Sequence, residues 1–90
     1  MEIDGIAVVE EPEDHGYSWR WDDPRGFESE ILWDRQIGSL ALGTRVPPGG
    51  WTHATLDPDR WGHARTVREA RVVVERYISH ATAKPRPKPA

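Results

Sequence analysis

The chain contains no cysteine, no asparagine, only two lysines and a single phenylalanine. Without thiols, disulfides and thiolate metal sites are excluded, so the fold has to be stable without covalent cross-links. No apolar run approaches the roughly 18 residues of a membrane helix, and the first residues lack the basic region of a signal peptide. We therefore expect a cytoplasmic protein that makes no contact with membranes.

Aromatic residues, in contrast, are plentiful. The 90 residues include five Trp, two Tyr and one Phe. A chain of this length forms one domain and buries only about 60% of the surface that is exposed when it is unfolded. Each buried ring removes on the order of 150–250 Å² from water, so the rings would dominate the energetics of such a small core.

The stretch YSWRWDDPRGFESEILW, residues 17–33, predicts a β-hairpin. Its centre, Asp23-Pro24-Arg25-Gly26, fits a type I turn followed by a glycine in the left-handed conformation. With Asp23 and Phe27 as the closing pair, one face of the hairpin collects Tyr17, Trp19, Trp21, Ile31 and Trp33. The other face collects Ser18, Arg20, Asp22, Glu28, Glu30 and Leu32.

Three further segments read as elements of the same domain. Residues 3–9 and 39–46 have strand character, and Pro12 is expected to end the first of them. Thr66 and Glu69 form a capping box, and apolar residues then recur at helical spacing, which predicts a helix from Thr66 to about His80. Residues 82–90 alternate proline with basic residues and predict a disordered tail.

The expected fold is α+β: a three- to four-stranded antiparallel meander with one C-terminal helix packed on one face, in a single domain of residues 1–81. The helix has to bury its apolar stripe, and the aromatic hairpin face is the large apolar surface available to it. We therefore interpret the rings as core. A stacking platform for single-stranded nucleic acid would need basic residues around it, whereas the hairpin carries acids such as Glu28 and Glu30.

Charge is divided unevenly along the chain. Residues 1–34 hold eleven acids and two Arg, whereas residues 35–90 hold ten basic residues and four acids. The basic part either faces an anionic partner or is attracted to the acidic part within the fold. In the first case the nucleic-acid-binding residues of the helix and tail would be Arg65, Arg68, Arg71, Arg76, Lys84, Arg86 and Lys88.

Residues 47–65 form a long segment rich in glycine and proline, with a short strand possible at Thr52–Leu56. Trp51 and Trp61 either anchor this segment to the core or provide contacts for a protein partner. Its four polar side chains His53, Asp57, Asp59 and His63 are of the types that bind divalent metals. Asp57-Pro58-Asp59-Arg60 is also a turn sequence, and the turn is the interpretation that we adopt, with no metal and no cofactor.

Signatures of catalysis are missing. The chain has no cysteine nucleophile, no serine in a nucleophile-elbow context and no glycine-rich phosphate loop. Its carboxylates are scattered along the predicted sheet, where acids usually serve solubility and protect edge strands. We therefore expect a binding module rather than an enzyme.

Three motifs occur in the order ESEILWD, LALGT and TVREARVVVERY. An acidic-Ile-x-x-Asp strand, a Leu-Gly-Thr strand end and a Thr-x-x-Glu-Ala helix start resemble, in this order, the small β-β-β-α DNA-binding modules of AP2 and phage-integrase arm-binding type. The resemblance covers about residues 17–80 and suggests an accessory protein of a phage or mobile element. It implies DNA contact by Arg20, Arg25 and Arg35 on the sheet, with Trp19 as a further contact.

Together these patterns predict a non-enzymatic accessory module that contacts an anionic partner, nucleic acid above all, through its basic helix and tail. The alternative is a protein-interaction adaptor or inhibitor that uses the acidic sheet face or the segment from Trp51 to Trp61. Either module is compatible with a monomer or a homodimer.

Overall fold

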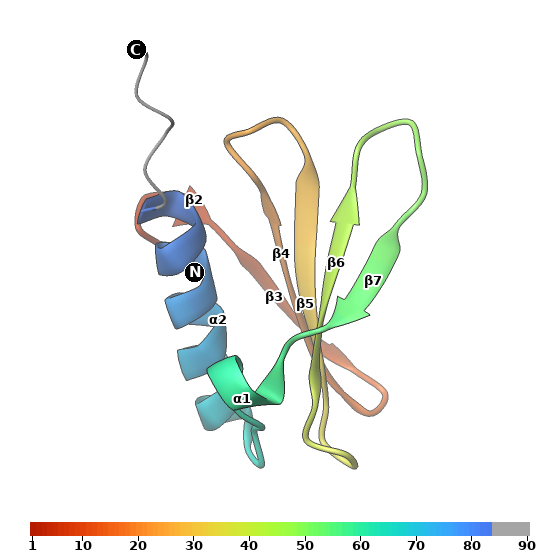
Figure 1. Cartoon of the computed structure of the whole chain (residues 1–90), viewed down its shortest axis with the longest axis vertical. Helices are drawn as coiled ribbons and strands as arrows, with labels where there is room; N and C mark the ends of the chain where they lie inside the picture. The colour runs from red at the N-terminus through yellow and green to blue at the C-terminus, as the bar shows by residue number, and fades with distance from the viewer. Residues whose placement is uncertain (84–90) are drawn as a thin grey trace.

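An antiparallel sheet and a long helix form two layers in the computed structural model, which describes residues 1–83 (Figure 1). The sheet has five strands whose spatial order follows the sequence, namely β3 (Val9–Glu13), β4 (Gly16–Asp22), β5 (Glu28–Asp34), β6 (Leu40–Arg45) and β7 (Thr52–Thr55). A separate two-stranded ribbon consists of β1 (Glu2–Ile3) and β2 (Ile6–Ala7). The helices are α1 (Pro58–Trp61) and α2 (Val67–Ala83).

The α+β class, the antiparallel meander and the C-terminal helix are confirmed, but the predicted number of strands is wrong. The expected strand at residues 3–9 is interrupted by a turn, in which Asp4 and Gly5 have φ angles of 51° and 80°. Pro12 does not end a strand but lies within β3, where it pairs with Tyr17. Because β3 is an edge strand, a residue without an N–H group can be accommodated in it.

The register of the central hairpin is confirmed. Trp19 pairs with Ile31 and Tyr17 pairs with Trp33. The turn closes as expected, with the Asp23 N–H donating to the Phe27 carbonyl at 2.7 Å and with a φ angle of 100° at Gly26. Two strands that lie next to each other in the sequence and share a short turn have few alternative registers, which is why local rules suffice here.

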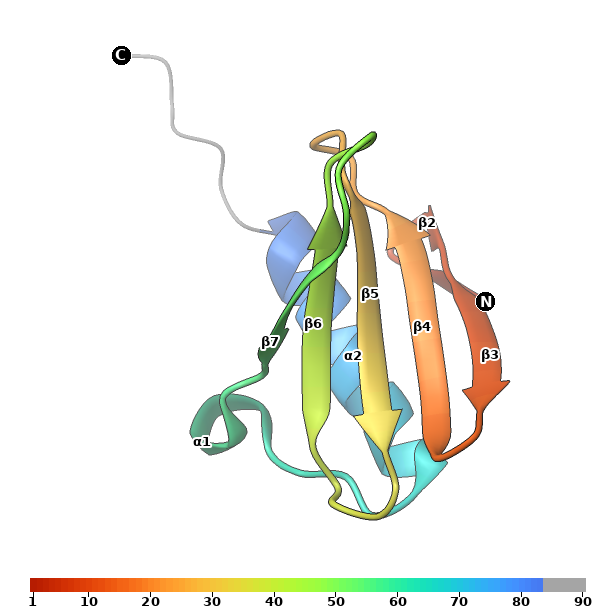
Figure 2. The same cartoon turned by 90° about the vertical axis from the view of Figure 1, so that its right-hand side faces the viewer.

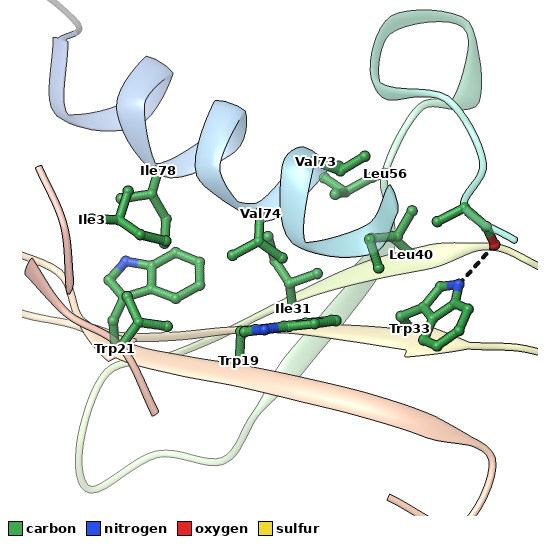
Figure 3. Packing of buried hydrophobic residues seen from close by; sticks show 13 residues of the cluster. Ile3, Trp19, Trp21, Ile31, Trp33, Leu40, Leu56, Val73, Val74 and Ile78 are labelled. Carbon is green, nitrogen blue, oxygen red and sulfur yellow. Dashed lines mark hydrogen bonds between the residues drawn. The ribbon is translucent and has the colours of Figure 1, made fainter. Parts of the chain in front are cut away.

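The aromatic face of the hairpin is the core, as predicted. α2 lies across this face with Trp19 and Trp21 buried beneath it, and Trp33 is buried next to Ala64, just before the start of α2 (Figure 3). Ile31 and Val74 meet between sheet and helix, and both are inaccessible to solvent. Burying an aliphatic side chain of this size stabilises the fold by about 1.5–3 kcal/mol.

One of the two hydrogen bonds that define the predicted capping box is present at the start of α2. The Glu69 N–H donates to the Thr66 hydroxyl oxygen at 3.2 Å, and the Thr66 hydroxyl lies 3.5 Å from a Glu69 carboxylate oxygen. The helix continues beyond the predicted end at His80 to Ala83. Helical backbone is disfavoured only at the residue that precedes Pro85, so the sequence contains no earlier stop signal.

The segment between β6 and α2 has more structure than the sequence suggested. The possible strand at Thr52–Leu56 is present as β7, which ends one residue earlier at Thr55. The predicted turn at Asp57 is the start of α1: the Asp57 carboxylate accepts the Asp59 N–H at 2.9 Å, and Pro58 is the first helical residue. Within residues 1–83, neither helix combines the length and hydrophobicity needed to cross a bilayer.

Candidate functional site

Two arginines that are 30 residues apart in the sequence line one hollow at the end of the sheet. Arg35 lies in the turn between β5 and β6, and Arg65 lies in the segment that leads into α2. The hollow has a volume of about 380 Å³, and His63 completes its basic lining. No carboxylate is among its lining residues. We call the group Arg35, His63 and Arg65 the basic hollow.

Two hydrogen bonds to the backbone of Ala64 hold this hollow together. The Ala64 N–H donates to the Gly38 carbonyl at 2.9 Å, and the Trp33 indole N–H donates to the Ala64 carbonyl at 2.8 Å (Figure 3). Gly38 has a φ angle of 71°, which a residue with a side chain adopts only at a cost. The segment before α2 is thereby fixed against the β5–β6 turn, and Figure 2 shows the two passing each other at one end of the molecule. Residues on either side of Ala64 are thus held close to Arg35.

A second cationic group surrounds the half-buried Trp61 at the end of α1. The guanidinium carbons of Arg60 and Arg76 lie 5.3 and 5.7 Å from the centre of the Trp61 ring. The rings of Tyr77 and His80 lie at 5.3 and 5.7 Å from it, and Arg60 Nη2 is 3.0 Å from His80 Nε2. Burial raises the pKa of the Tyr77 hydroxyl, so this group stays neutral. We call Arg60, Trp61, Arg76 and His80 the Trp61 cluster.

The predicted basic residues of α2 do not form one continuous face. Arg71 makes two hydrogen bonds to the Glu10 carboxylate, at 2.6 and 2.9 Å. These bonds are the main reason that the pKa of Glu10 is lowered. Since a helix turns by about 100° per residue, Arg71 and Arg76 point about 140° apart. Arg68 is exposed, but its neighbour Arg71 is already paired with an acid.

On the sheet, two of the arginines implied as DNA contacts are paired with carboxylates. Arg20 lies 3.4 Å from Glu30. Arg25 donates twice to Asp23, at 2.8 and 3.0 Å, and this interaction lowers the pKa of Asp23. Arg35 lies beyond the end of β5, in the turn. The sheet face away from α2 therefore has few free positive charges with which to contact DNA.

The two tryptophans of the long segment belong to different surroundings. Trp51 is half-buried and stacks on His53 with 6.2 Å between ring centres, whereas Trp61 packs on the side of α2. His53 Nε2 lies 2.8 Å from a Glu30 oxygen, and Asp57 caps α1. Among residues 1–83, no group of three or more His, Asp or Glu side chains is arranged to hold a metal ion.

Sequence reasoning missed some of the residues that the fold brings to these sites. Arg60 and His80 come together only because α1 packs beside α2, so the only local signal was the adjacency of Arg60 and Trp61. The predicted tail contacts Lys84, Arg86 and Lys88 lie outside the described residues.

Comparison with known proteins yields no match, whether with family models, with curated proteins or with solved structures. The function of this chain is therefore inferred from the geometry of the basic hollow and the Trp61 cluster.

Proposed function

We propose that this protein is a small non-enzymatic module that binds nucleic acid through the phosphate backbone. The supporting observation is the basic hollow, in which Arg35, His63 and Arg65 surround a cavity whose lining includes no carboxylate. In the proposed role the protein acts in the cytoplasm, as a monomer or homodimer, as an accessory factor of the kind found in phages and mobile elements.

The chemistry of the hollow suits a phosphate group. A guanidinium group presents several N–H donors in one plane and binds phosphate oxygens in a bidentate manner. Because Arg35 and Arg65 line the same cavity, both can donate to a phosphate that enters it. Such contacts fix the position of the nucleic acid without reading its bases, so we expect binding with little sequence preference.

The Trp61 cluster supports a second phosphate contact. Arg60 and Arg76 are both within cation–π distance of the Trp61 ring. This interaction restricts their side chains before a ligand arrives, which reduces the entropy that binding would otherwise cost. Arg68 and the basic residues of the tail add positive charge to the same half of the chain.

The test is a titration of a fluorescently labelled, mixed-sequence DNA duplex at about 50 and about 200 mM salt, since phosphate contacts make affinity fall steeply with salt. The double variant Arg35→Ala/Arg65→Ala is expected to weaken binding at both salt concentrations. The plot of log K against log salt should also become shallower: the magnitude of its negative slope should fall by about 2, or about 0.9 for each lost contact.

Arg20→Ala/Arg45→Ala is the matched control, because it removes two positive charges that already face Glu30 and Glu28 on the sheet. Its affinity for DNA should remain close to that of the wild type. Equal weakening by the two double variants would show that only net charge matters and would contradict the proposed interface.

A further inference from the structure

No element of residues 1–83 lies over the sheet face that points away from α2 (Figures 1 and 2). A cavity of about 610 Å³ lies on this face, between the β3–β4 turn and the β5–β6 turn. We call it the sheet groove and define it by Glu13, Asp14, Glu30, Leu32, Asp34 and Ile37. Its volume falls in the range of about 300–1,000 Å³ that is usual for binding pockets.

The floor and one rim of the sheet groove are apolar. Leu32 of β5 and Ala41 of β6 are paired across the two strands and are only half-buried. Ile37, in the adjacent turn, is 68% exposed. Aliphatic side chains left in contact with water at the edge of a cavity are a source of binding free energy for a ligand that covers them.

The carboxylates around this floor are held in place. Glu13 accepts a hydrogen bond of 2.8 Å from the hydroxyl of Ser18, which is itself 1% exposed. Asp34 accepts the Gln36 N–H at 2.8 Å, within the β5–β6 turn. Each of these contacts occupies one carboxylate oxygen, so the other oxygen of Glu13 and of Asp34 is available to a ligand.

Among residues 1–83, only one acid of the sheet groove has an arginine partner. Glu30 is 6% exposed, and its two oxygens lie 3.4 Å from Arg20 and 2.8 Å from His53. Gly43 makes this arrangement possible, because a Cβ atom there would lie 2.7 Å from the His53 ring. With Glu30 compensated, Glu13, Asp14 and Asp34 leave the sheet groove negatively charged.

From this combination we infer that the sheet groove binds an extended, arginine-bearing segment of a protein partner. The stem of an arginine side chain packs on apolar surface while its guanidinium group reaches a carboxylate. Leu32 and Ile37 provide the apolar surface, and Glu13 and Asp34 provide carboxylates at its rim. Nucleic acid is repelled by the same charges, so the sheet groove and the basic hollow select different partners.

The experiment is an NMR titration of the ¹⁵N-labelled full chain with a blocked heptapeptide of alternating arginine and valine. Amide shifts are expected at Leu32 and Ala41, which line the sheet groove and do not line the basic hollow. Glu13→Gln/Asp14→Asn keeps an acceptor for Ser18 but removes two charges, and it should weaken peptide binding roughly tenfold, which is the effect of about 0.7 kcal/mol per charge. Ile37→Ser should weaken binding without any change in charge.

Glu2→Gln/Glu75→Gln is the matched control, since both residues are exposed and neither lines the sheet groove. An equal loss of affinity in this control, or peptide-induced shifts confined to Arg35 and Arg65, would overturn the inference. The absence of peptide binding would overturn it as well. If raising the protein concentration alone caused the same shifts, this face would instead bind a second copy of the chain, which would also overturn the inference.

The inference and the proposed function can fail separately. Glu13→Gln/Asp14→Asn should still bind the DNA duplex, and Arg35→Ala/Arg65→Ala should still bind the peptide. A single variant that lost both ligands would indicate a folding defect, which the dispersion of its amide spectrum would reveal.

Discussion

Replacing Glu10 with alanine is expected to destabilise the protein more than replacing its partner Arg71. The Glu10 carboxylate accepts hydrogen bonds from the indole N–H of Trp19 at 2.7 Å and from two nitrogens of Arg71. It connects an edge strand, the centre of the core and α2. Trp19 is inaccessible to solvent, whereas the Arg71 side chain is 39% exposed.

The size of the effect follows from this difference in exposure. Glu10→Ala leaves the buried Trp19 N–H without an acceptor, which costs about 1–3 kcal/mol. Loss of the partly exposed pair with Arg71 adds about 0.2–1 kcal/mol, because water and salt screen such a pair. Together these losses amount to about 1–4 kcal/mol, or a fall in Tm of about 5–30 °C for a domain of this length. Arg71→Ala keeps the acceptor for Trp19, and we expect it to cost about 1 kcal/mol or less.

Urea denaturation followed by tryptophan fluorescence measures both variants, with Glu10→Gln as the control. The glutamine retains an oxygen that can accept from Trp19 and removes only the charge, so its stability should lie close to that of Arg71→Ala. The reasoning would be refuted if Glu10→Ala were no less stable than Arg71→Ala, since the buried indole N–H would then contribute nothing measurable.

Three further outcomes are expected. The pKa of Glu10 is lowered in the folded state. Its contribution to stability is therefore present above the unfolded pKa of about 4.3 and is lost as pH falls through the folded pKa. The urea midpoint of Glu10→Gln should fall less on acidification than that of the wild type. Gly16→Ala should lower the free energy of unfolding, measured in urea, by at least about 2 kcal/mol, because the new Cβ atom would overlap the Trp33 carbonyl oxygen. Gly50 has open space around it, so the control Gly50→Ala should change this free energy by less than about 0.5 kcal/mol. Trp33→Phe removes the donor to the Ala64 carbonyl, so hydrogen exchange near Ala64 should become faster and DNA affinity should fall although no charge is lost.

Several features could be predicted because they depend on neighbours in the sequence. The turn after Asp23 has few alternative conformations, and it sets the register that brings Trp19 opposite Ile31. The capping box at Thr66 is likewise a contact over three residues. Once the register is set, the alternation of side chains decides which hairpin face is aromatic and therefore buried.

The predictions about elements failed where a local signal had a second structural solution. A proline ends a central strand but is tolerated in an edge strand, and only the arrangement of the sheet shows that β3 is an edge. At Asp57 the predicted contacts are correct, since its carboxylate accepts a backbone N–H and Pro58 follows it, but the turn that they form is the first turn of the short helix α1.

The candidate sites depend on contacts between residues far apart in the sequence. The sequence by itself determined which residues are cationic and that α2 would carry Arg68, Arg71 and Arg76. Only the tertiary structure decided that Arg71 is paired with Glu10, 61 positions away, and that Arg35 and Arg65 share one hollow. The physical reason is that charge interactions act through space, so the role of an arginine depends on which carboxylates packing brings within about 4 Å of it.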